Sequence, residues 1–480
     1  MQIVACPSCG AQVQFKSHAS VVAVCEYCRA TVMKDADAVK DLGKMSAVLE
    51  DYTRLQIGSA GTLAGRGFSV VGRIQLKYAA GMWNEWYLLF DDGATGWLGD
   101  SSGQYTVTTA MDATSALPAF EDIVAGRHYN INDERFTAAE TRSASCIGGQ
   151  GELPFKVGAG WQTRVADLRH GSAFVTLDYA DGDTPVLYKG LAVTLEQMQC
   201  QLLRDDEQIR QTAGRYRGRL EALDCPSCGS AIGYLPGVTT SLVCPACQAV
   251  LDASTPQAQI LAQSANVTGV RTTLALGATA TIGKVTWQLI GAMTRADDEG
   301  SGWTEYLLYN TAAGFFWLVE TDQGWSRSAV MASWPEWASV KADSASIDQV
   351  SFRKLYDYPA TVQWAAGAFN WRVAAGDVVR VFEFESGQTR LAAELTGEEL
   401  TWSRSTPVAF DQVRSWFGDT PAAIAPKKPP STGSATRFAL WILGLNAIPL
   451  LFNFSGTIFW VVIAIVAIYL SEHFFGAKNP

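Results

Sequence analysis

The sequence has few of the residues that several common functions require. Four histidines occur in 480 residues, and none forms a recognisable pair with a nucleophile. Lysine and arginine number 37 against 47 aspartates and glutamates, whereas nucleic-acid binding relies on clustered basic residues. The N-terminus has no basic stretch followed by an apolar one, so we expect no secretory signal. These shortages argue against imidazole-based catalysis, a chain-wide nucleic-acid surface and secretion.

A long apolar run is present near the C-terminus. Residues 438–475 are almost continuously apolar, and this run of 38 residues is too long for one helix across a bilayer. A polar break at 453–456 predicts a transmembrane helical hairpin over 437–476, after a flexible Pro- and Ser-containing tether over 419–436. Basic residues flank the run on both sides, so the positive-inside rule places both ends in the cytoplasm. The alternative is a buried hairpin in a soluble core.

Eight of the ten cysteines form two groups with one spacing. Each group reads C-x2-C, then fifteen residues, then C-x2-C, and every member of the second group follows its counterpart by 219 residues. Nearly the same offset relates later motifs, which predicts a tandem duplication of a two-part unit. The two groups are Cys6, Cys9, Cys25 and Cys28, and Cys225, Cys228, Cys244 and Cys247.

This cysteine spacing is typical of structural zinc sites. Two residues between cysteines allow one tight turn to present both thiolates to one ion, and four thiolates suit tetrahedral Zn²⁺ with no position left for a catalytic water. Disulfides are disfavoured in a cytoplasmic chain, and an iron–sulfur cluster does not explain the zinc-ribbon spacing. We therefore expect two structural zinc ions, in zinc ribbons at 1–33 and 223–252.

The larger segments after each ribbon are predicted to be mainly β. Short runs rich in β-branched and aromatic residues are bounded by Gly, Asp and Asn, which indicates a small barrel-like or sandwich-like domain at 52–190 and another at 271–418. Apolar residues at helical spacing predict one linking α-helix at 191–222. Shorter helices are expected after the ribbons, at 34–51 and 255–264.

A repeated W-x-E-[WY] motif supplies the candidate ligand-binding residues. Trp83 and Glu85 share one face of a strand, as do Trp303 and Glu305 in the second copy. A carboxylate beside an indole is partly desolvated, which suits an acid, a base or a cation-binding group. The alternative is a buried glutamate satisfied by the backbone or by arginine within the core. Core packing accounts for most tryptophans, and the loop at 334–337 is the best candidate for an exposed aromatic surface.

These motifs together resemble a bacterial family known as domain of unknown function 4178. The resemblance rests on the glycine-bounded strand Gly58–Gly72, the segment Trp83–Trp86 and the segment Gly151–Val157, with counterparts in the second copy. One departure is Ala368, which stands where the first copy has Glu152 and where the pattern has an acid. The resemblance implies no established activity and no catalytic residue.

The sequence therefore predicts a membrane-anchored adaptor or binding protein rather than an enzyme. We expect it at a bacterial inner membrane, with its soluble domains facing the cytoplasm and recruiting protein or ligand partners. The alternative is an enzyme or enzyme subunit that uses the W-x-E-[WY] carboxylates. Nucleic-acid binding by the ribbons is not expected, because the second ribbon has no Lys or Arg between Leu223 and Asp252.

Overall fold

The computed structural model divides the chain into two compact units, Met1–Ala423 and Ile424–Pro480. It describes residues 2–17, 19–35, 38–45, 53–101, 103–155, 161–205, 207–209, 221–234, 241–252, 259–262, 272–311, 313–418 and 462–464.

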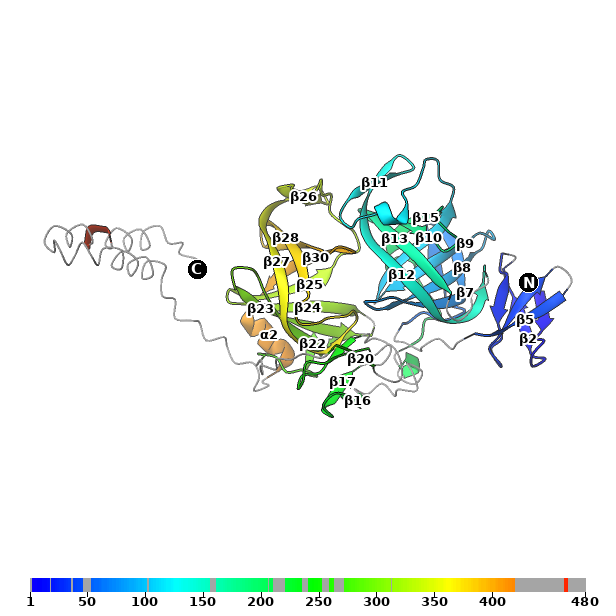
Figure 1. Ribbon diagram of the computed structural model, residues 1–480, viewed down its shortest axis with the longest axis horizontal. Helices are drawn as coiled ribbons and strands as arrows, with labels where there is room; N and C mark the ends of the chain where they lie inside the picture. The colour runs from blue at the N-terminus through cyan, green and yellow to red at the C-terminus, as the bar shows by residue number, and fades with distance from the viewer. Residues whose placement is uncertain are drawn as a thin grey trace. The chain divides into compact units, whose positions relative to one another are not determined.

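The first β-domain is a closed barrel of eight antiparallel strands (Figure 1). Two four-stranded meanders form it, and the ring closes because the last strands of the two meanders pair with each other, as do the first strands. Two short strands, β6 (Ala60–Leu63) and β11 (His128–Ile131), pair with the wall. In order around the ring, the strands are β7 (Arg66–Lys77), β8 (Met82–Phe90), β9 (Thr95–Ser101), β10 (Gln104–Met111), β15 (Val186–Val193), β14 (Ala173–Asp178), β13 (Gln162–His170) and β12 (Glu134–Leu153).

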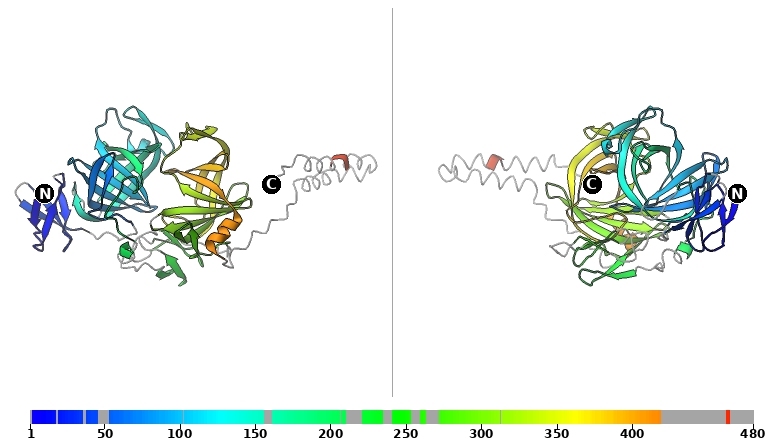
Figure 2. Two further views of the ribbon diagram at one scale, coloured as in Figure 1. Left: turned by 180° about the vertical axis from the view of Figure 1, so that it is seen from behind. Right: turned by 45° about the vertical axis from the view of Figure 1, so that its right-hand side comes forward.

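The second β-domain repeats this ring strand for strand, and Figure 2 shows both rings from two further sides. The short strands β21 (Thr279–Ile282) and β26 (Ser344–Ile347) correspond to β6 and β11. The ring consists of β22 (Val285–Ala296), β23 (Gly302–Asn310), β24 (Gly314–Thr321), β25 (Gly324–Val330), β30 (Leu400–Val408), β29 (Thr389–Leu395), β28 (Val378–Ser386) and β27 (Val350–Phe369). Of the two forms expected from the sequence, barrel or sandwich, the structure has the barrel.

Glycine allows the two meanders to cross closely where each ring closes. Gly72 of β7 lies opposite Gly151 of β12, and a Cβ on Gly72 would lie 1.7 Å from the carbonyl oxygen of Glu152. Gly291 and Gly367 face each other at the same point of the second ring. Bulges beside these glycines bend the long strands, which is how a flat sheet is curled into a barrel.

Each ribbon is continuous with its barrel, because β3 pairs with the end of β12 and β18 pairs with the end of β27. The helices expected after the ribbons are wrong for the described residues of 34–51 and 255–264, where β5 extends the first ribbon and β20 the second. The ribbon strands are β1 (Gln2–Ala5), β2 (Gln12–Phe15), β3 (Val22–Val24), β4 (Ala30–Asp35) and β5 (Ala38–Lys44), and β16 (Glu221–Asp224), β17 (Ala231–Tyr234), β18 (Ser241–Val243), β19 (Val250–Asp252) and β20 (Gln259–Ala262).

Each ribbon also shares a hydrophobic core with one end of its barrel. In the first copy Val22, Val24 and Met33 of the ribbon belong to the same buried cluster as Ile74 and Leu76 of the barrel interior. A matching cluster in the second copy joins ribbon residues such as Leu242 and Leu251 to barrel residues such as Met293 and Phe369. The ribbons therefore close an apolar end of each barrel, and the polar part of the interior lies beyond it.

The predicted linking helix is wrong over residues 191–203. Strand β15 continues to Val193, and turns follow in which Gln199 and Leu202 have φ values of 48° and 55°, outside the helical region. Met198 is fully buried against the outer face of the barrel. The apolar residues whose spacing predicted a helix therefore pack against the barrel from turns instead. Residues 207–209 are helical, and 210–220 lie outside the described residues.

The loop at 334–337 is not an exposed aromatic surface. Trp334 and Trp337 are each 6% exposed, and the Trp337 ring lies 5.3 Å from that of Trp402 and 5.2 Å from that of Phe382. These side chains form part of a core on the outside of the second barrel wall. An aromatic pair in a loop here marks the place where the loop folds back onto the sheet.

Two short helices complete the described fold, η1 (Phe120–Asp122) and α2 (Phe410–Phe417), and α2 packs Val413 and Phe417 into the second β-domain. The hairpin predicted over 437–476 lies outside the described residues except for a helical stretch at 462–464, and so does the tether. Among the residues that the structure describes, no helix is both long and apolar enough to cross a membrane.

Candidate ligand-binding cavity and metal centres

The eight repeated cysteines form two compact clusters. Within each cluster all four sulfur atoms lie within 4.8 Å of one another. The contacts between the two turns are Cys6–Cys28 at 3.6 Å and Cys9–Cys25 at 3.7 Å, with 3.7 Å for both matching pairs in the second ribbon. A tetrahedral ion with bonds of about 2.3 Å to sulfur sets its ligands roughly 3.8 Å apart, so the geometry of both clusters fits one metal ion each.

Each cysteine pair is held by the same tight turn. The backbone N–H of Gly10 donates to the carbonyl of Cys6 at 2.8 Å, and Gly229 repeats this bond to Cys225 at 2.7 Å. Both glycines have φ of 77°, a left-handed conformation that glycine adopts without steric cost. The turns therefore aim both thiolates of the pair to one side.

Glu152 attaches the first ribbon to its barrel. This side chain is 4% exposed and accepts hydrogen bonds from the backbone N–H groups of Lys16 and Ser17, at 2.6 and 2.9 Å, and from the Ser20 hydroxyl at 2.8 Å. All three donors lie between β2 and β3 of the ribbon. The corresponding residue of the second copy is Ala368, so that copy lacks this clamp.

Replacing Glu152 with alanine is expected to loosen the first ribbon locally. Bonds to a charged acceptor are lost and buried donors are left unsatisfied, which costs about 3 kcal/mol. Hydrogen exchange measured by mass spectrometry should show faster exchange in residues 16–24, with both metal ions retained. The second ribbon of the same molecule is the control, and unchanged exchange in residues 16–24 would show that the clamp contributes nothing.

The W-x-E-[WY] carboxylates lie inside the barrels, on the cavity wall. The indole N–H of Trp83 donates to Glu85 at 2.8 Å, and Trp303 donates to Glu305 at 2.7 Å. Trp86, three positions from Trp83 and therefore on the opposite face of the strand, is buried on the other side of the wall. The motif therefore places a Trp–Glu pair on the cavity wall and a second aromatic residue in the core of the outer face.

Two further carboxyls repeat at matched interior positions. Asp167 of β13 corresponds to Glu383 of β28. Each lies two residues after a valine, Val165 or Val381, and these two valines have matching partners in the neighbouring strands. Asp178 of β14 likewise corresponds to Glu394 of β29. Together with the W-x-E-[WY] glutamate, each barrel has three interior carboxyls at equivalent places on three strands.

The positive charge that pairs with the interior carboxylates comes from different strands in the two barrels. In the first copy Arg142 of β12 pairs with Asp167 and stacks over Trp83, 4.3 Å from the ring centroid. In the second copy the residue matching Arg142 is Tyr358, and Arg295 of β22 supplies the positive charge. Both interiors thus contain the three carboxyls, but the arginine that pairs with them lies on β12 in the first barrel and on β22 in the second.

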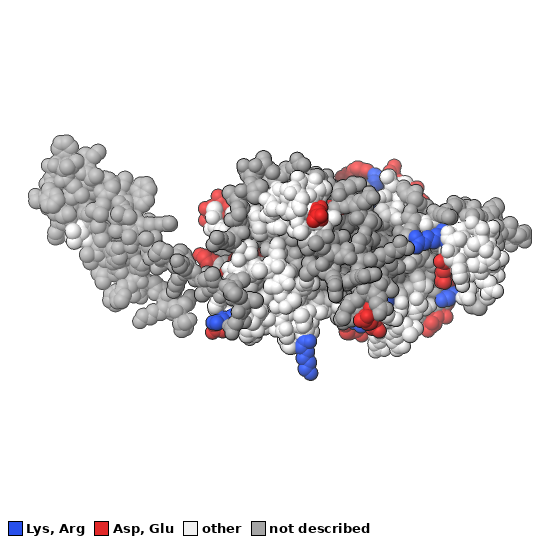
Figure 3. All heavy atoms as spheres, turned by 90° about the horizontal axis from the view of Figure 1, so that it is seen from below, with Lys and Arg blue, Asp and Glu red and all other residues white. Residues whose placement is uncertain are grey.

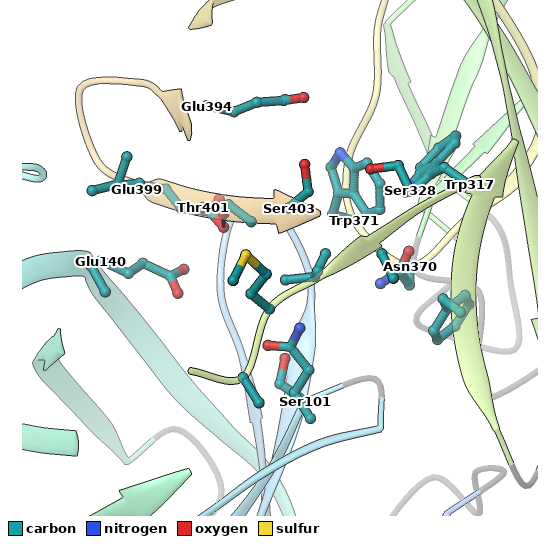
Figure 4. Close-up of a pocket in the computed structure, with 18 of the residues that line it drawn as sticks. Ser101, Glu140, Trp317, Ser328, Asn370, Trp371, Glu394, Glu399, Thr401 and Ser403 are labelled. Atoms are coloured by element: carbon teal, nitrogen blue, oxygen red, sulfur yellow. Dashed lines mark hydrogen bonds between the residues drawn. The ribbon is translucent and has the colours of Figure 1, made fainter. Parts of the chain in front are cut away.

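A continuous cavity of about 1780 Å³ takes in these residues. It is lined by both copies, and Figure 4 shows Glu140 of the first copy and Trp371, Glu394 and Ser403 of the second around it. Aromatic side chains form part of the wall, among them Trp97 in the first copy. The cavity is larger than the roughly 300–1,000 Å³ of typical small-molecule sites, but aromatic walls with convergent polar groups are a property that it shares with them.

Burial shifts the protonation of the interior carboxyls of the first copy. It raises the pKa of Glu85 to about 7, with the charge of Asp167 adding to the shift and the Trp83 hydrogen bond opposing it. Burial also raises the pKa of Glu140 to about 8 and raises that of Asp178. In the second copy burial raises the pKa of Glu305, but Arg295 opposes the shift.

Part of this arrangement has a signal in the sequence. Asp167 and Glu383 align as acids at an offset of 216, the same offset that relates Gly151 to Gly367. The alternation of the strands places them inward with Glu85, but only the closed ring brings three such strands around one interior. The exchange of arginine between β12 and β22 has no signal in the sequence, because the two positions do not align.

Comparison with known families matches each barrel separately. A model of the family described as "Domain of unknown function (DUF4178)" matches residues 56–194 and 275–410, which together make up more than half of the chain. Each match covers one barrel, and the cysteine ribbons lie outside both. No curated protein matches the chain.

Proposed function

The chain belongs to the DUF4178 family, in two tandem copies, and from this we propose that it is a binding protein whose barrels hold a small ligand against their interior carboxylates. One observation carries the proposal. Both copies present the same Trp–Glu pair and the same two additional carboxyls to a cavity at equivalent strand positions. Three buried ionisable groups in one interior lower the stability of a fold, which is the pattern expected where function requires them.

The ribbons in this proposal hold structural zinc. Four thiolates at tetrahedral spacing suit Zn²⁺ among the common metals, and their closed shell leaves no coordination site for substrate. When bound, the ion stabilises a module too small to build its own core. Because each ribbon shares a cluster with the apolar end of its barrel, zinc would also keep that end closed.

The location and partners of the protein form the rest of the proposal. The apolar sequence at 438–475 supports anchoring at a bacterial inner membrane, with the barrels on the cytoplasmic side recruiting ligands or proteins there. We do not propose binding to nucleic acid. On the face drawn in Figure 3 the described Lys and Arg side chains are scattered, several of them beside Asp or Glu, whereas phosphate recognition uses grouped basic residues.

General acid–base catalysis is the second candidate function, and one observation favours it. Glu85 and Glu140, with pKa values raised to about 7 and about 8, could each exchange a proton near neutral pH. The second copy keeps neither property in the same form, because Arg295 lies beside Glu305 and Tyr356 replaces Glu140. Conversion of a bound compound into a product, followed by mass spectrometry, would establish catalysis.

A thermal-shift screen of the full chain with a fragment library tests the binding proposal. We expect some fragments to raise the melting temperature of the wild type and to lose this effect in a variant carrying both Glu85→Gln and Glu305→Gln. Glu134→Gln is the matched control, since that side chain is 56% exposed and pairs with Lys189 at the surface. If no fragment effect depends on Glu85 or Glu305, the proposed function is wrong.

A further inference from the structure

The arginine that differs between the two barrels marks a place for a cation. In the second barrel Nη1 of Arg295 lies 3.1 Å from both carboxylate oxygens of Glu394 and 3.5 Å from Glu305. The arginine side chain is 8% exposed, so these two carboxylates hold a nearly desolvated guanidinium. The interior of the second barrel thus accommodates a cationic group between two carboxylates.

The matched carboxyls of the first barrel have no such partner. Glu85 accepts one hydrogen bond from the indole of Trp83, and Asp178 accepts bonds from Thr163 at 2.6 Å and from the backbone of Ala180 at 2.9 Å. Within the part of the chain that the structure describes, neither carboxyl forms an ion pair. Burial is the main cause of the raised pKa of Glu85, with Asp167 and Asp178 adding to it and the Trp83 hydrogen bond and Arg142 opposing it. Burial also raises the pKa of Asp178, and the charge of Asp167 adds to that shift.

The strand register explains why the partner is missing. Arg295 lies opposite Trp303 in the β22–β23 ladder, and Leu76 lies opposite Trp83 at the same place in the β7–β8 ladder. Leu76 is 3% exposed and lines the cavity. The first barrel therefore has a leucine where the second barrel has its internal cation.

Arg142 does not replace Arg295 as the partner of Glu85. Its Nε lies 3.4 Å from Glu140, and its Nη2 bonds to Asp167. Glu140 and Asp167 are thus the carboxyls with which Arg142 forms ion pairs. The charge of Arg142 opposes the raised pKa of Glu85 but forms no ion pair with Glu85 or Asp178 among the described residues.

We infer that the first barrel binds an organic cation, with a guanidinium or ammonium group between Glu85 and Asp178, in the position that Arg295 fills in the second barrel. The inference rests on the proposed function, that the barrel interior takes a small ligand. The second barrel, already occupied by its own side chain, does not bind this ligand.

Aromatic rings at this end of the cavity suit the organic part of such a ligand. The Phe155 ring stacks on Trp161 at 5.3 Å between centroids and lies 5.8 Å from Trp97, and all three line the cavity with Trp83. A cation over or beside indole faces is stabilised by the negative potential of the rings. A carbon chain extending from the charged group would be covered by the same rings.

The test titrates the full chain with three probes of similar size by calorimetry. Propylguanidinium carries the charge of an arginine side chain, propylurea has nearly the same shape without charge, and butanoate has the opposite charge. We expect one propylguanidinium site per chain, with a dissociation constant at least tenfold lower than that of propylurea. Butanoate should bind more weakly than propylurea.

Leu76→Arg places an internal cation in the first barrel, and Arg295→Leu removes the one in the second barrel. Leu76→Arg should abolish propylguanidinium binding by filling the first site, and Glu85→Gln should weaken it at least tenfold. Arg295→Leu should create a second site, and propylguanidinium should raise the melting temperature of this variant more than that of the wild type. Asp92→Asn is the control and should change nothing, since that carboxylate is paired with Arg66 on the surface.

Three results would overturn the inference. Equal or tighter binding of propylurea or butanoate would show that the barrel takes a ligand, as proposed, but not a cation. Unchanged propylguanidinium binding in Leu76→Arg, which remains informative if Arg295→Leu fails to fold, would place the ligand elsewhere. Absence of binding by all three probes would contradict the cation site, while the fragment screen decides the broader proposal independently.

Discussion

Replacing Glu85 with glutamine is expected to make the ligand-free protein more stable at pH 8, by about 3 kcal/mol. The pKa of this carboxyl is raised from 4.5 to about 7 by burial, so the folded state binds its proton more tightly than the unfolded state does. Stability is then lost as pH rises from about 4.5 through 7, because the buried group must ionise. Each pKa unit corresponds to about 1.4 kcal/mol, and glutamine avoids that cost.

The same replacement in the second copy is expected to give no such gain. Glu305→Gln removes one of the two carboxylates around the buried Arg295, which then depends on Glu394 alone. The recovered burial cost is offset by the weakened pairing of a buried cation. Melting curves of both variants from pH 5 to pH 8 provide the comparison. If the stability of the wild type and that of Glu85→Gln depended equally on pH, ionisation of the buried Glu85 would carry no cost in stability.

Loss of a single ribbon thiolate is expected to have the largest effect on the fold. Cys244→Ser should reduce bound zinc from two ions to one per chain and unfold the second ribbon, because binding free energies of structural zinc are about 10–16 kcal/mol and are linked to folding. Cys244 belongs to the same cluster as Leu307 and Phe369 of the barrel, so the apolar end of that barrel should loosen as well.

Metal analysis and hydrogen exchange together check this expectation. Residues 221–252 should lose protection, the ends of β22 and β27 should lose part of theirs, and the first ribbon should be unaffected. Cys200→Ser is the matched control, because Cys200 lies outside both clusters. Retention of two zinc ions, or a ribbon that stays protected without its ion, would contradict a structural role for the metal.

The parts of the molecule that the sequence predicts are those with local signals. The cysteine ligands lie three residues apart in each turn, so spacing alone identifies them. The W-x-E-[WY] motif places Trp83 and Glu85 on one face because strand side chains alternate. The tandem copies follow from the 219-residue offset of the cysteines and the nearly equal offsets of later motifs, and they match the family residues, 56–194 and 275–410.

The parts that sequence reasoning missed depend on contacts between distant strands. Ring closure requires β10 to pair with β15 and β7 to pair with β12, and no local sequence pattern indicates these strand pairs. The helical spacing near residue 198 was misleading, because Met198 is buried against a barrel wall that the periodicity does not reveal. Trp334 and Trp337 were misread for the same reason, since turn residues say nothing about what a loop covers.

The cation site proposed for the first barrel also depends on such a distant relation. Leu76 and Arg295 align without difficulty, but the meaning of their difference depends on Asp178 and Glu394, which come from strands across the interior. In the proposal, the buried arginine fills the site in the second barrel, and the leucine leaves the matching site of the first barrel open to a ligand.

Proton release on ligand binding tests the cation site most directly. The full chain is titrated with propylguanidinium at pH 7 in two buffers of different ionisation enthalpy. Glu85, with a pKa of about 7, is about half protonated there, and a bound cation lowers its pKa. The account predicts one site per chain, release of about half a proton per ligand and affinity that rises from pH 6 to pH 8. Proton uptake, or binding that is independent of pH and unchanged by Glu85→Gln, would contradict it.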